Sequence, residues 1–381
     1  MLDNPFTPVF GGKPDFFFGR KELLARFSRA LKDRGSEDRT LFVTATRGMG
    51  KTALVEQLSL NARSRGWRVI DLGPENTVHA LVRRLAGFDE QSKTVDPQVS
   101  VNVLGSGASL GGMSTTKTLR ADSSDLDLLL IQACEHEKNG VMVTIDEIQK
   151  LAEHDVSAIS NAFQMASRKG CEAILVMAGL PYAYDEIGGY EGCTFMRRAS
   201  HVRLGLLSHE EVSEAFETIW HGDTSLPDES FARMVAASLG HPYMVQLLGY
   251  YLVERLNSLG IEPSALPSEQ LMDVIHEALD AYCSRALRPL VKELTGAEHA
   301  YLTATARALD AERLAPVARI GELLGKDSKQ TSSVRSRLLK QGLLIAPRRG
   351  SLRFTVPYLA DYLLQPTPEE DEAHLLREWG V

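Results

Sequence analysis

The sequence contains no apolar run of about 18 residues, the length that a helix needs to cross a lipid bilayer. We therefore expect no transmembrane helix and no membrane partner. The opening residues, MLDNPFTPVFGG, lack the basic start and the apolar core of a signal peptide. From these absences and from the cysteine usage below, we expect a cytoplasmic protein.

Cysteine is scarce, and the 10 histidines form no HExxH motif and no paired metal spacing. The absence of a CxxC pair favours reduced thiols in a cytoplasm, and the absence of paired ligands argues against a zinc site. The four cysteines lie far apart in the chain, at Cys134, Cys171, Cys193 and Cys283.

The composition is that of a soluble globular chain with two or three domains, because 381 residues contain 44% hydrophobic and 24% charged residues. The formal charge of −8 is unevenly distributed, since residues 297–365 contain 11 Lys and Arg against 6 Asp and Glu. A basic module on an acidic body suggests that any nucleic-acid contact is local to the C-terminal end.

A phosphate-binding loop is predicted between a β-branched strand at 40–44 and a helix at 51–65. The intervening turn follows the pattern GxxxxGK[ST], except that Ala45 stands at its first position, where a positive φ would be costly. Backbone N–H groups and the helix N-terminus would hold a polyphosphate, Lys51 would reach its terminal oxygens, and Thr52 would ligate Mg²⁺. We assign nucleotide binding to Thr46, Arg47, Gly48, Met49, Gly50, Lys51 and Thr52.

Two adjacent carboxylates follow a second apolar run, GVMVTIDEIQ at 140–149, which predicts a strand buried on both faces. Asp146 is placed to hold the Mg²⁺ shell, and Glu147 to orient and deprotonate the water that attacks the γ-phosphate. Acids at the end of an apolar strand are costly unless a cation or a polar ligand meets them.

Strands and helices alternate up to residue 207, with further strands at 67–73, 171–181 and 201–207, which makes a parallel sheet the economical arrangement. We predict an α/β ATPase core at 1–207 with an inserted hairpin or loop at 92–124. A helical lid at 208–295, a winged helix at 296–365 and an acidic tail at 366–381 would follow.

Several side chains outside the loop are candidates for the same site. Phe18 and Gly19 precede the first helix, where a Pro- and Gly-rich arm would lie over the adenine. Arg197 and Arg198 are candidate arginine fingers for a neighbouring subunit, or else a solvated pair. His241 and Pro242 open an apolar helix of the lid, where His241 would sense the nucleotide or serve only as a cap.

The C-terminal segment has helix-turn-helix spacing, with helices at 298–309, 317–324 and 328–341, and then a strand, a basic turn and a strand. The last helix would enter a major groove while the basic turn touches phosphate, although winged helices also serve as protein contacts. The candidate DNA-binding residues are Lys329, Gln330, Arg337, Lys340, Arg348 and Arg349.

Taken together, these motifs resemble AAA+ ATPases of the initiator-like branch, related to archaeal and prokaryotic origin-recognition proteins, and also the STAND signalling ATPases. The resemblance implies a five-stranded parallel sheet, a helical lid, ATP with Mg²⁺ and nucleotide-dependent association into homo-oligomers. It rests on FFFGRKELL (16–24), TRGMGKT (46–52), IDEIQ (145–149), AGLP (178–181), GHPYMVQLL (240–248) and the winged helix.

Two functions fit this resemblance. One is an ATP hydrolase, with brisk or slow turnover, whose nucleotide state controls assembly and binding to double-stranded DNA. The other is a regulatory switch that binds nucleotide almost without turnover and recruits a protein partner. The departures at Ala45 and at Ala178–Gly179, where a polar γ-phosphate sensor would be expected, leave both open. A motor is disfavoured because no aromatic pore loop follows the second strand.

Overall fold

The computed structural model describes residues 2–9, 16–87, 125–219, 225–327 and 329–365. The predicted insertion at 92–124 and the predicted tail at 366–381 lie outside the described residues. The chain forms two compact units. We call Arg20–Ala45 with Lys51–Leu204 the sheet unit, and Met1–Gly19, Thr46–Gly50 and Gly205–Val381 the lid unit. No helix within the described ranges has the length and apolar character needed to span a membrane.

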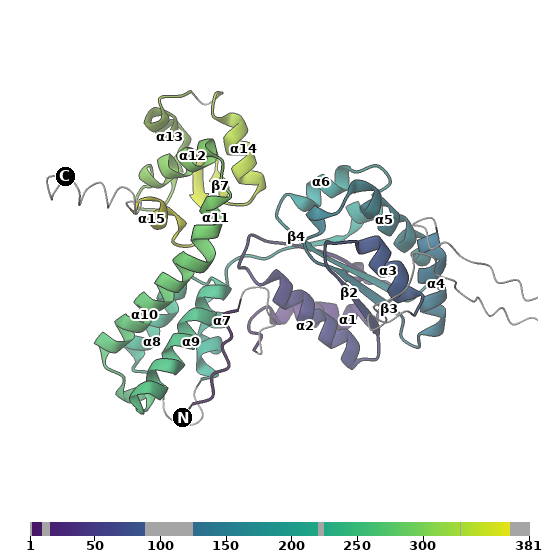
Figure 1. The fold of residues 1–381 in the computed structure, drawn as a ribbon, viewed down its shortest axis with the longest axis horizontal. Coiled ribbons are helices and arrows are strands. Elements are labelled where there is room, and N and C mark those ends of the chain that lie inside the picture. Colours follow the sequence, from purple (N-terminus) through teal and green to yellow (C-terminus); the bar gives the residue numbers. More distant parts are fainter. Residues whose placement is uncertain (1, 10–15, 88–124, 220–224, 328, 366–381) are drawn as a thin grey trace, which may run out of the picture. The chain divides into compact units, whose positions relative to one another are not determined.

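The sheet unit contains a five-stranded parallel sheet in the order β2-β3-β4-β1-β5, which confirms the predicted fold class (Figure 1). All four strand pairings are parallel, so each connection between two strands brings the chain back to the end of the sheet where the strands begin. The strands are β1 (Thr40–Thr44), β2 (Arg68–Leu72), β3 (Val141–Ile145), β4 (Ala173–Gly179) and β5 (Ser200–Arg203).

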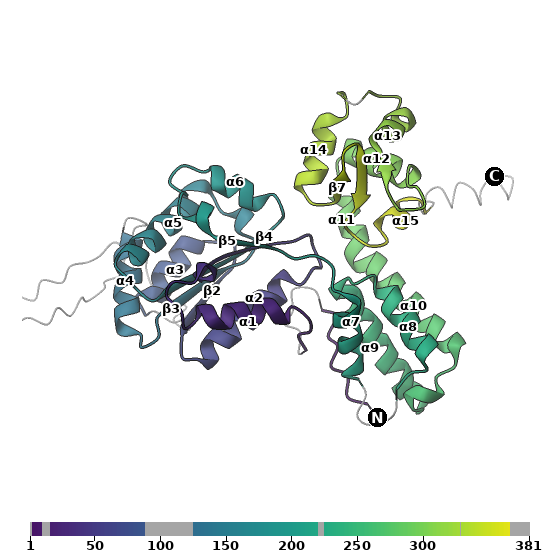
Figure 2. The ribbon, with the colours of Figure 1, turned by 180° about the vertical axis from the view of Figure 1, so that it is seen from behind.

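Helices cover both faces of this sheet. Figures 1 and 2 show α1 and α2 on one face and α5 and α6 on the other. The helices α3, α4 and α5 share one apolar core with β2, β3 and β4, and this core buries Val141, Val143 and Ile145 of β3. Met142 and Thr144, which alternate with them, are buried as well, as expected for a strand covered on both faces. The helices are α1 (Lys21–Ala30), α2 (Lys51–Ser64), α3 (Thr77–Leu85), α4 (Leu126–His136), α5 (Glu153–Arg168) and α6 (Ala183–Gly189).

The fifth strand is shorter than the sequence predicted. The predicted range was 201–207, whereas β5 ends at Arg203. Its last ladder partner is Thr44, the end of β1, and Leu204 N donates to Thr44 O at 2.8 Å. Beyond that point β1 offers no further partner, so the chain leaves the sheet.

The lid unit begins with a helical bundle. A capping box opens its first helix, as predicted, because Glu211 N donates to Ser208 Oγ at 3.1 Å and Ser208 N to Glu211 Oε2 at 2.9 Å. The elements are α7 (His209–Glu217), α8 (Asp228–Ser238), α9 (Pro242–Leu259), α10 (Ser268–Tyr282), a π-helical segment (Cys283–Leu287) and α11 (Arg288–Lys292).

The C-terminal module, residues 296–365, combines helices with a three-stranded antiparallel sheet in the order β6-β8-β7. The three helices and the two strands after them come in the predicted order, whereas the short strand Ala315–Pro316 and the last helix, Leu359–Leu363, were not predicted. The elements are α12 (Gly296–Arg307), β6 (Ala315–Pro316), α13 (Val317–Leu324), α14 (Ser332–Lys340), β7 (Leu344–Arg348), β8 (Ser351–Phe354) and α15 (Leu359–Leu363).

The predicted start of the last module helix at residue 328 is wrong, because α14 begins at Ser332. The Asp327 side chain accepts hydrogen bonds from the backbone N–H groups of Lys329 and Gln330, both at 2.8 Å. These two bonds are those of a helix cap, but Ser332 N donates to Lys329 O at 3.2 Å, so the chain makes a tight turn here and the α-helix starts only at Ser332. Lys329 and Gln330 therefore lie in the turn before α14, whereas Arg337 and Lys340 lie on the helix.

Candidate nucleotide-binding site

The turn after β1 adopts the backbone that a phosphate-binding loop requires. Gly48 and Gly50 have φ values of 79° and 81°, a region that favours glycine. Ala45 is not among the residues with positive φ, and its N–H donates to Gly179 O at 3.2 Å. The departure from the glycine pattern at Ala45 therefore introduces no backbone strain at that position.

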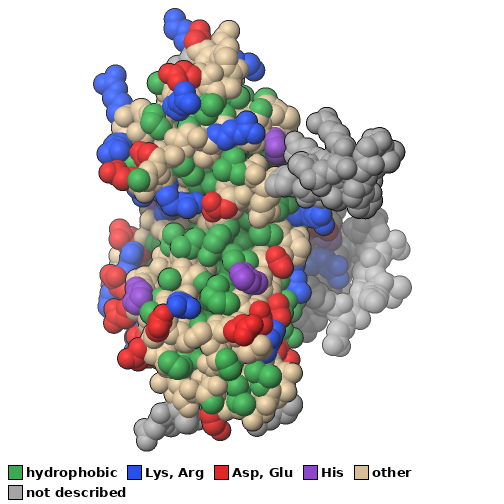
Figure 3. Space-filling model, turned by 90° about the vertical axis from the view of Figure 1, so that its left-hand side faces the viewer, with side chains coloured by type: hydrophobic (Ala, Val, Ile, Leu, Met, Phe, Trp, Pro, Cys, Tyr) green, Lys and Arg blue, Asp and Glu red, His purple; other side chains and the backbone are tan. Residues whose placement is uncertain are grey.

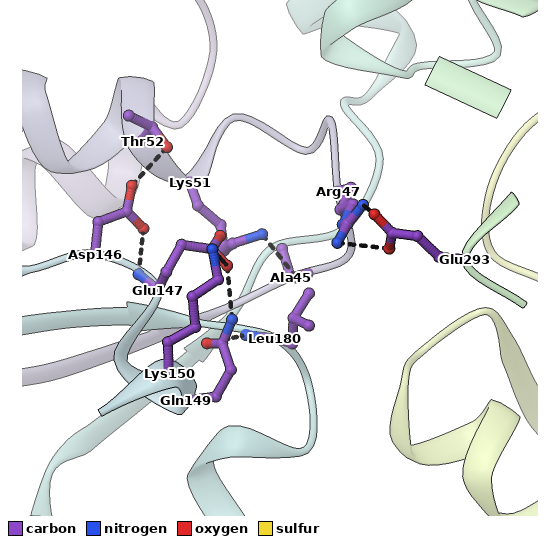
Figure 4. Close-up of polar contacts among 10 residues, drawn as sticks. All are labelled: Ala45, Arg47, Lys51, Thr52, Asp146, Glu147, Gln149, Lys150, Leu180 and Glu293. Atoms are coloured by element: carbon purple, nitrogen blue, oxygen red, sulfur yellow. Dashed lines mark hydrogen bonds and ion pairs between the residues drawn. The ribbon is translucent and has the colours of Figure 1, made fainter. Parts of the chain in front are cut away.

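Lys51 and Thr52 lie at the start of α2, directly after this turn. The Lys51 side chain is buried, and its Nζ donates to Ala45 O at 3.0 Å. Thr52 Oγ1 donates to Asp146 Oδ2 at 2.7 Å, across from α2 to the residue that follows β3 (Figure 4). The structure thus brings together the lysine, the hydroxyl and the first carboxylate that were predicted to share a site.

The fit of these donors to Mg²⁺ follows from their chemistry. Mg²⁺ prefers hard oxygen ligands and is usually held by one or two carboxylates together with substrate phosphates and water. Thr52 and Asp146 offer a hydroxyl and a carboxylate within hydrogen-bond distance of each other. Among the described residues, no group of three or more His, Cys, Asp or Glu side chains forms a closed metal cage. This donor set fits a metal that also binds a phosphate.

Glu147 is held in an unusual conformation. Its φ of 53° places a non-glycine residue in the left-handed region, which costs about 1–3 kcal/mol and persists only when the surroundings enforce it. Its N–H donates to Asp146 Oδ1 at 2.8 Å, and its Oε2 accepts from Gln149 Nε2 at 2.7 Å. Both contacts fix the second carboxylate beside the first.

The Gln149 side chain lies at the end of β4, where the sequence has Ala178 and Gly179 in place of a polar γ-phosphate sensor. Its Oε1 accepts from the N–H of Leu180, just after β4, at 3.2 Å (Figure 4). The side chain thereby links Glu147 to the end of the strand that lies between β1 and β3. The sequence analysis missed this residue, although its place in IDEIQ, two residues beyond Glu147, was a usable signal.

In the lid unit, the loop residues 46–50 pack against the start of α9. A Cβ atom on Gly48 would lie 2.6 Å from His241 Cε1, so the imidazole is in direct contact with the loop. Pro242 lies beside Gly50, where an added Cβ would meet Pro242 Cβ at 4.0 Å. The predicted proximity of His241 and Pro242 to the phosphate loop is therefore present within this unit.

His241 is fully buried, and burial lowers its pKa to about 4. The Arg47 backbone opposes this shift through a hydrogen bond. The ring packs edge-on against Tyr282, with centroids 5.2 Å apart, and no described residue bonds its Nδ1 atom. At neutral pH the imidazole is uncharged, so it meets the loop as a neutral hydrogen-bonding group.

The remaining candidates lie in separate surroundings. Phe18 packs on Phe16 with ring centroids 5.7 Å apart, and a Cβ on Gly19 would lie 2.8 Å from Leu207 Cδ2. These contacts place both residues in the lid unit, and their role at the adenine stays a prediction.

Arg197 and Arg198 are exposed in a 3₁₀ turn (Met196–Arg198), and Arg197 Nε donates to Gly188 O.

The basic candidates of the C-terminal module are exposed. On α14, Arg337 Nε lies 3.2 Å from Glu298 Oε1. Arg348 ends β7 and pairs with Glu312 at 3.2 Å, and Arg349 follows it in the turn to β8. In Figure 3, Lys and Arg side chains gather toward the upper end of the view.

Comparison with known proteins supports the fold. Residues 17–176 match the family described as AAA ATPase domain, and residues 285–363 match a family described as a domain of unknown function. Among curated proteins, none matches the sequence.

Solved structures with a similar fold include the ORC2 protein of Aeropyrum pernix. The ADPNP-ADP complexes of that protein match with a TM-score of 0.60 and 15% identity, over 98% of each chain. Its ADP form matches with a TM-score of 0.54 and 15% identity, over 97% of each chain. The fold of the chain is therefore the AAA+ fold that these structures share.

Proposed function

We propose that this chain, which contains an AAA ATPase domain on an AAA+ fold, binds ATP with Mg²⁺, hydrolyses it, and uses the bound nucleotide to control its association with duplex DNA and with further copies of itself. The observation that carries the proposal is the 2.7 Å contact between Thr52 and Asp146 beside the buried Lys51. The similar ORC2 structures contain ADPNP and ADP, which supports a nucleotide ligand.

Each residue would have a separate task. Lys51 would exchange its bond to Ala45 O for the terminal phosphate oxygens, and the N–H groups of residues 46–50 would hold the remaining oxygens. Thr52 and Asp146 would hold Mg²⁺, which would neutralise phosphate charge when bound. Glu147 would orient a water and accept its proton.

The proposed control of DNA binding and assembly is supported by the distribution of basic residues and by the exposure of their side chains. The excess of Lys and Arg lies in the C-terminal module, with Arg337 and Lys340 on α14 and Arg348 and Arg349 at the hairpin. Arg197 and Arg198 are exposed, as a residue that completes a neighbouring site must be.

A regulatory switch with little turnover is the second candidate, and one observation favours it. The Glu147 carboxylate already accepts a hydrogen bond from Gln149 Nε2 at 2.7 Å, so one of its oxygens is occupied before a water is bound. In that case the nucleotide would set the conformation of the chain, and hydrolysis would be incidental. The C-terminal module would then recruit a protein partner.

The test of hydrolysis is Glu147→Gln, measured by ATP binding and by phosphate release. We expect binding to persist and phosphate release to fall about 10²- to 10⁴-fold, the usual contribution of a general base. Glu135→Gln, on an exposed face of α4, is the matched control and should change neither quantity. Unchanged turnover in Glu147→Gln would refute the assigned role.

Gln149→Ala separates the two candidates. If Gln149 positions an active base, its removal lowers phosphate release. If it restrains Glu147, as in a switch, its removal raises phosphate release. In either case ATP affinity should stay close to that of the unaltered chain, because Gln149 bonds to Glu147 and to the N–H of Leu180, neither of which is assigned to phosphate or metal binding.

A further inference from the structure

A two-point ion pair joins the phosphate loop to the residue that follows α11. Arg47 Nη1 donates to Glu293 Oε1 at 3.0 Å, and Arg47 Nη2 lies 2.9 Å from Glu293 Oε2 (Figure 4). Both nitrogens of the guanidinium fork therefore face both oxygens of one carboxylate. This two-point geometry is specific for carboxylate or phosphate, so Glu293 holds Arg47 in the manner in which phosphate oxygens would hold it.

Glu293 lies directly between the lid helices and the C-terminal module. It follows α11 and comes two residues before Thr295, which caps α12. Thr295 and Glu298 form a capping box, in which Glu298 N donates to Thr295 Oγ1 at 3.3 Å and Thr295 N to Glu298 Oε2 at 2.9 Å. Glu293 is thus separated by one residue from the capping box that starts the first helix of the module.

Glu298 in turn contacts α14, the helix proposed for the major groove. Its Oε1 lies 3.2 Å from Arg337 Nε and accepts from Gln341 Nε2 at 3.4 Å. The Glu298 side chain is 3% exposed, whereas the Arg337 side chain is 52% exposed, so only the carboxylate side of this pair is sheltered from water. Arg47 is therefore connected to Arg337 by the ion pair with Glu293, by the backbone from Glu293 to Thr295, and by the contacts of Glu298.

A second set of contacts joins the phosphate loop to the end of α10, ahead of Glu293 in the chain. Tyr282, the last residue of α10, packs on His241, which packs on Gly48. The π-helical segment lies between Tyr282 and Glu293, and such segments interrupt regular helices frequently at functional sites. Residues 282–293 are thus linked to the phosphate loop in two places, at Tyr282 through the buried His241 ring and at Glu293 through an exposed ion pair.

We propose that Glu293 is a latch on the phosphate loop, and that ATP releases it by taking over the guanidinium of Arg47. This inference rests on the proposed function, since it names the regulation of the same site. One fork cannot bind the carboxylate and a phosphate group at two points each, so the two partners compete. By linkage, whatever strengthens the Arg47–Glu293 pair weakens nucleotide binding, and the nucleotide frees the linker of the C-terminal module.

The size of the effect follows from exposure. The side chains of Arg47 and Glu293 are 52% and 58% exposed, and exposed ion pairs contribute little because water screens them. We therefore expect Glu293→Gln to tighten Mg-ATP binding by about two- to fivefold. Glu262→Gln, an exposed carboxylate elsewhere in the lid unit, is the matched control and should leave the affinity unchanged.

The decisive experiment is a double-mutant cycle with Arg47→Gln and Glu293→Gln, measured by calorimetric titration with Mg-ATP. A latch predicts that Glu293→Gln tightens binding only when Arg47 is present. Equal tightening in both backgrounds would show a general charge effect and would overturn the latch. If the unaltered chain binds no Mg-ATP at all, the proposed function itself fails, which is a separate outcome.

Hydrogen exchange supplies a second readout that affinity alone does not give. The latch predicts faster amide exchange at residues 293–299 when Mg-ATP is added to the unaltered chain. It predicts the same faster exchange in Glu293→Gln without nucleotide. Exchange that is unchanged in both samples would overturn the proposal even if the affinities agreed with it.

Discussion

His241 shows how one side chain responds to its surroundings. Burial lowers its pKa from 6.5 to about 4, so the folded chain keeps it neutral where the unfolded chain would protonate it. Between pH 6.5 and pH 4 the unfolded state binds the additional proton. The free energy of unfolding therefore decreases as the pH falls through this window and is fully retained above it.

We expect this histidine to contribute a pH-dependent loss of about 2 kcal/mol between pH 7 and pH 5 in the unfolding of the lid unit. His241→Gln, which cannot titrate, should lose less stability over the same interval. Urea unfolding at both pH values measures the difference. His79→Gln, on an exposed face of α3, is the control and should keep the full loss of the unaltered chain. An equal loss in His241→Gln would contradict the burial argument.

At the scale of single residues, the sequence identified the contacts that a local motif encodes. Lys51 and Thr52 follow from the loop pattern, and the acids after β3 follow from an apolar strand that ends in charge. Glu293 was missed because its partner Arg47 is distant in sequence, and Gln149 was missed although one of its two partners, Glu147, is only two residues away. Gln149 meets Leu180 only since β4 lies between β1 and β3, a strand order that the sequence does not state.

At the scale of elements, the N-terminal arm lies along α9. Leu2 N donates to Asn257 Oδ1 at 2.6 Å, and Thr7 N donates to Gln246 Oε1 at 2.9 Å. Between them Phe6 lies over Gly249, where an added Cβ would be 2.6 Å from the Phe6 ring. The glycine therefore creates the space that the ring fills, and the side-chain amides of α9 satisfy the backbone of an extended segment.

Gly249→Ala should displace this arm. We expect a loss of about 1–3 kcal/mol in the free energy of unfolding of the lid unit, the usual cost of overpacking. Residues 2–9 should also exchange their amide hydrogens faster. Gly296→Ala, a helical glycine with open space around its Cβ position, is the control. If Phe6→Ala and Gly249→Ala had fully additive effects, the direct contact would be ruled out.

The elements that the sequence predicted best have local causes. The capping box at Ser208 fixed the start of α7, and Gly325, with a φ of 63°, ends α13 as predicted. The start of α14 was missed because residues 329–331 form a tight turn, closed by Ser332 N donating to Lys329 O at 3.2 Å, although Asp327 accepts N–H groups as a helix cap would. The end of β5 was missed because it depends on where its neighbour β1 ends.

At the scale of the whole molecule, charge asymmetry is the feature that composition predicts and fold class does not. The chain is acidic overall, with a formal charge of −8, whereas its C-terminal module is basic. A polyanion would be repelled by most of the surface and attracted by one module. DNA association, if it occurs through this module, should therefore depend on few phosphate contacts and should be sensitive to each of them.

Replacing Arg348 and Arg349 with Ala tests this directly. Each lysine or arginine that contacts a phosphate contributes about one unit to the slope of log Kobs against log salt concentration. The double variant should weaken duplex binding at low salt and reduce that slope by about two. Arg319→Ala is the matched control and should retain the slope, because Arg319 is an exposed arginine paired with a carboxylate, as Arg348 is, but lies on α13 and not at the hairpin. An unchanged slope in the double variant would show that the hairpin does not contact DNA phosphates. It would favour a protein as the partner of the C-terminal module, since winged helices bind either class of macromolecule through the same elements.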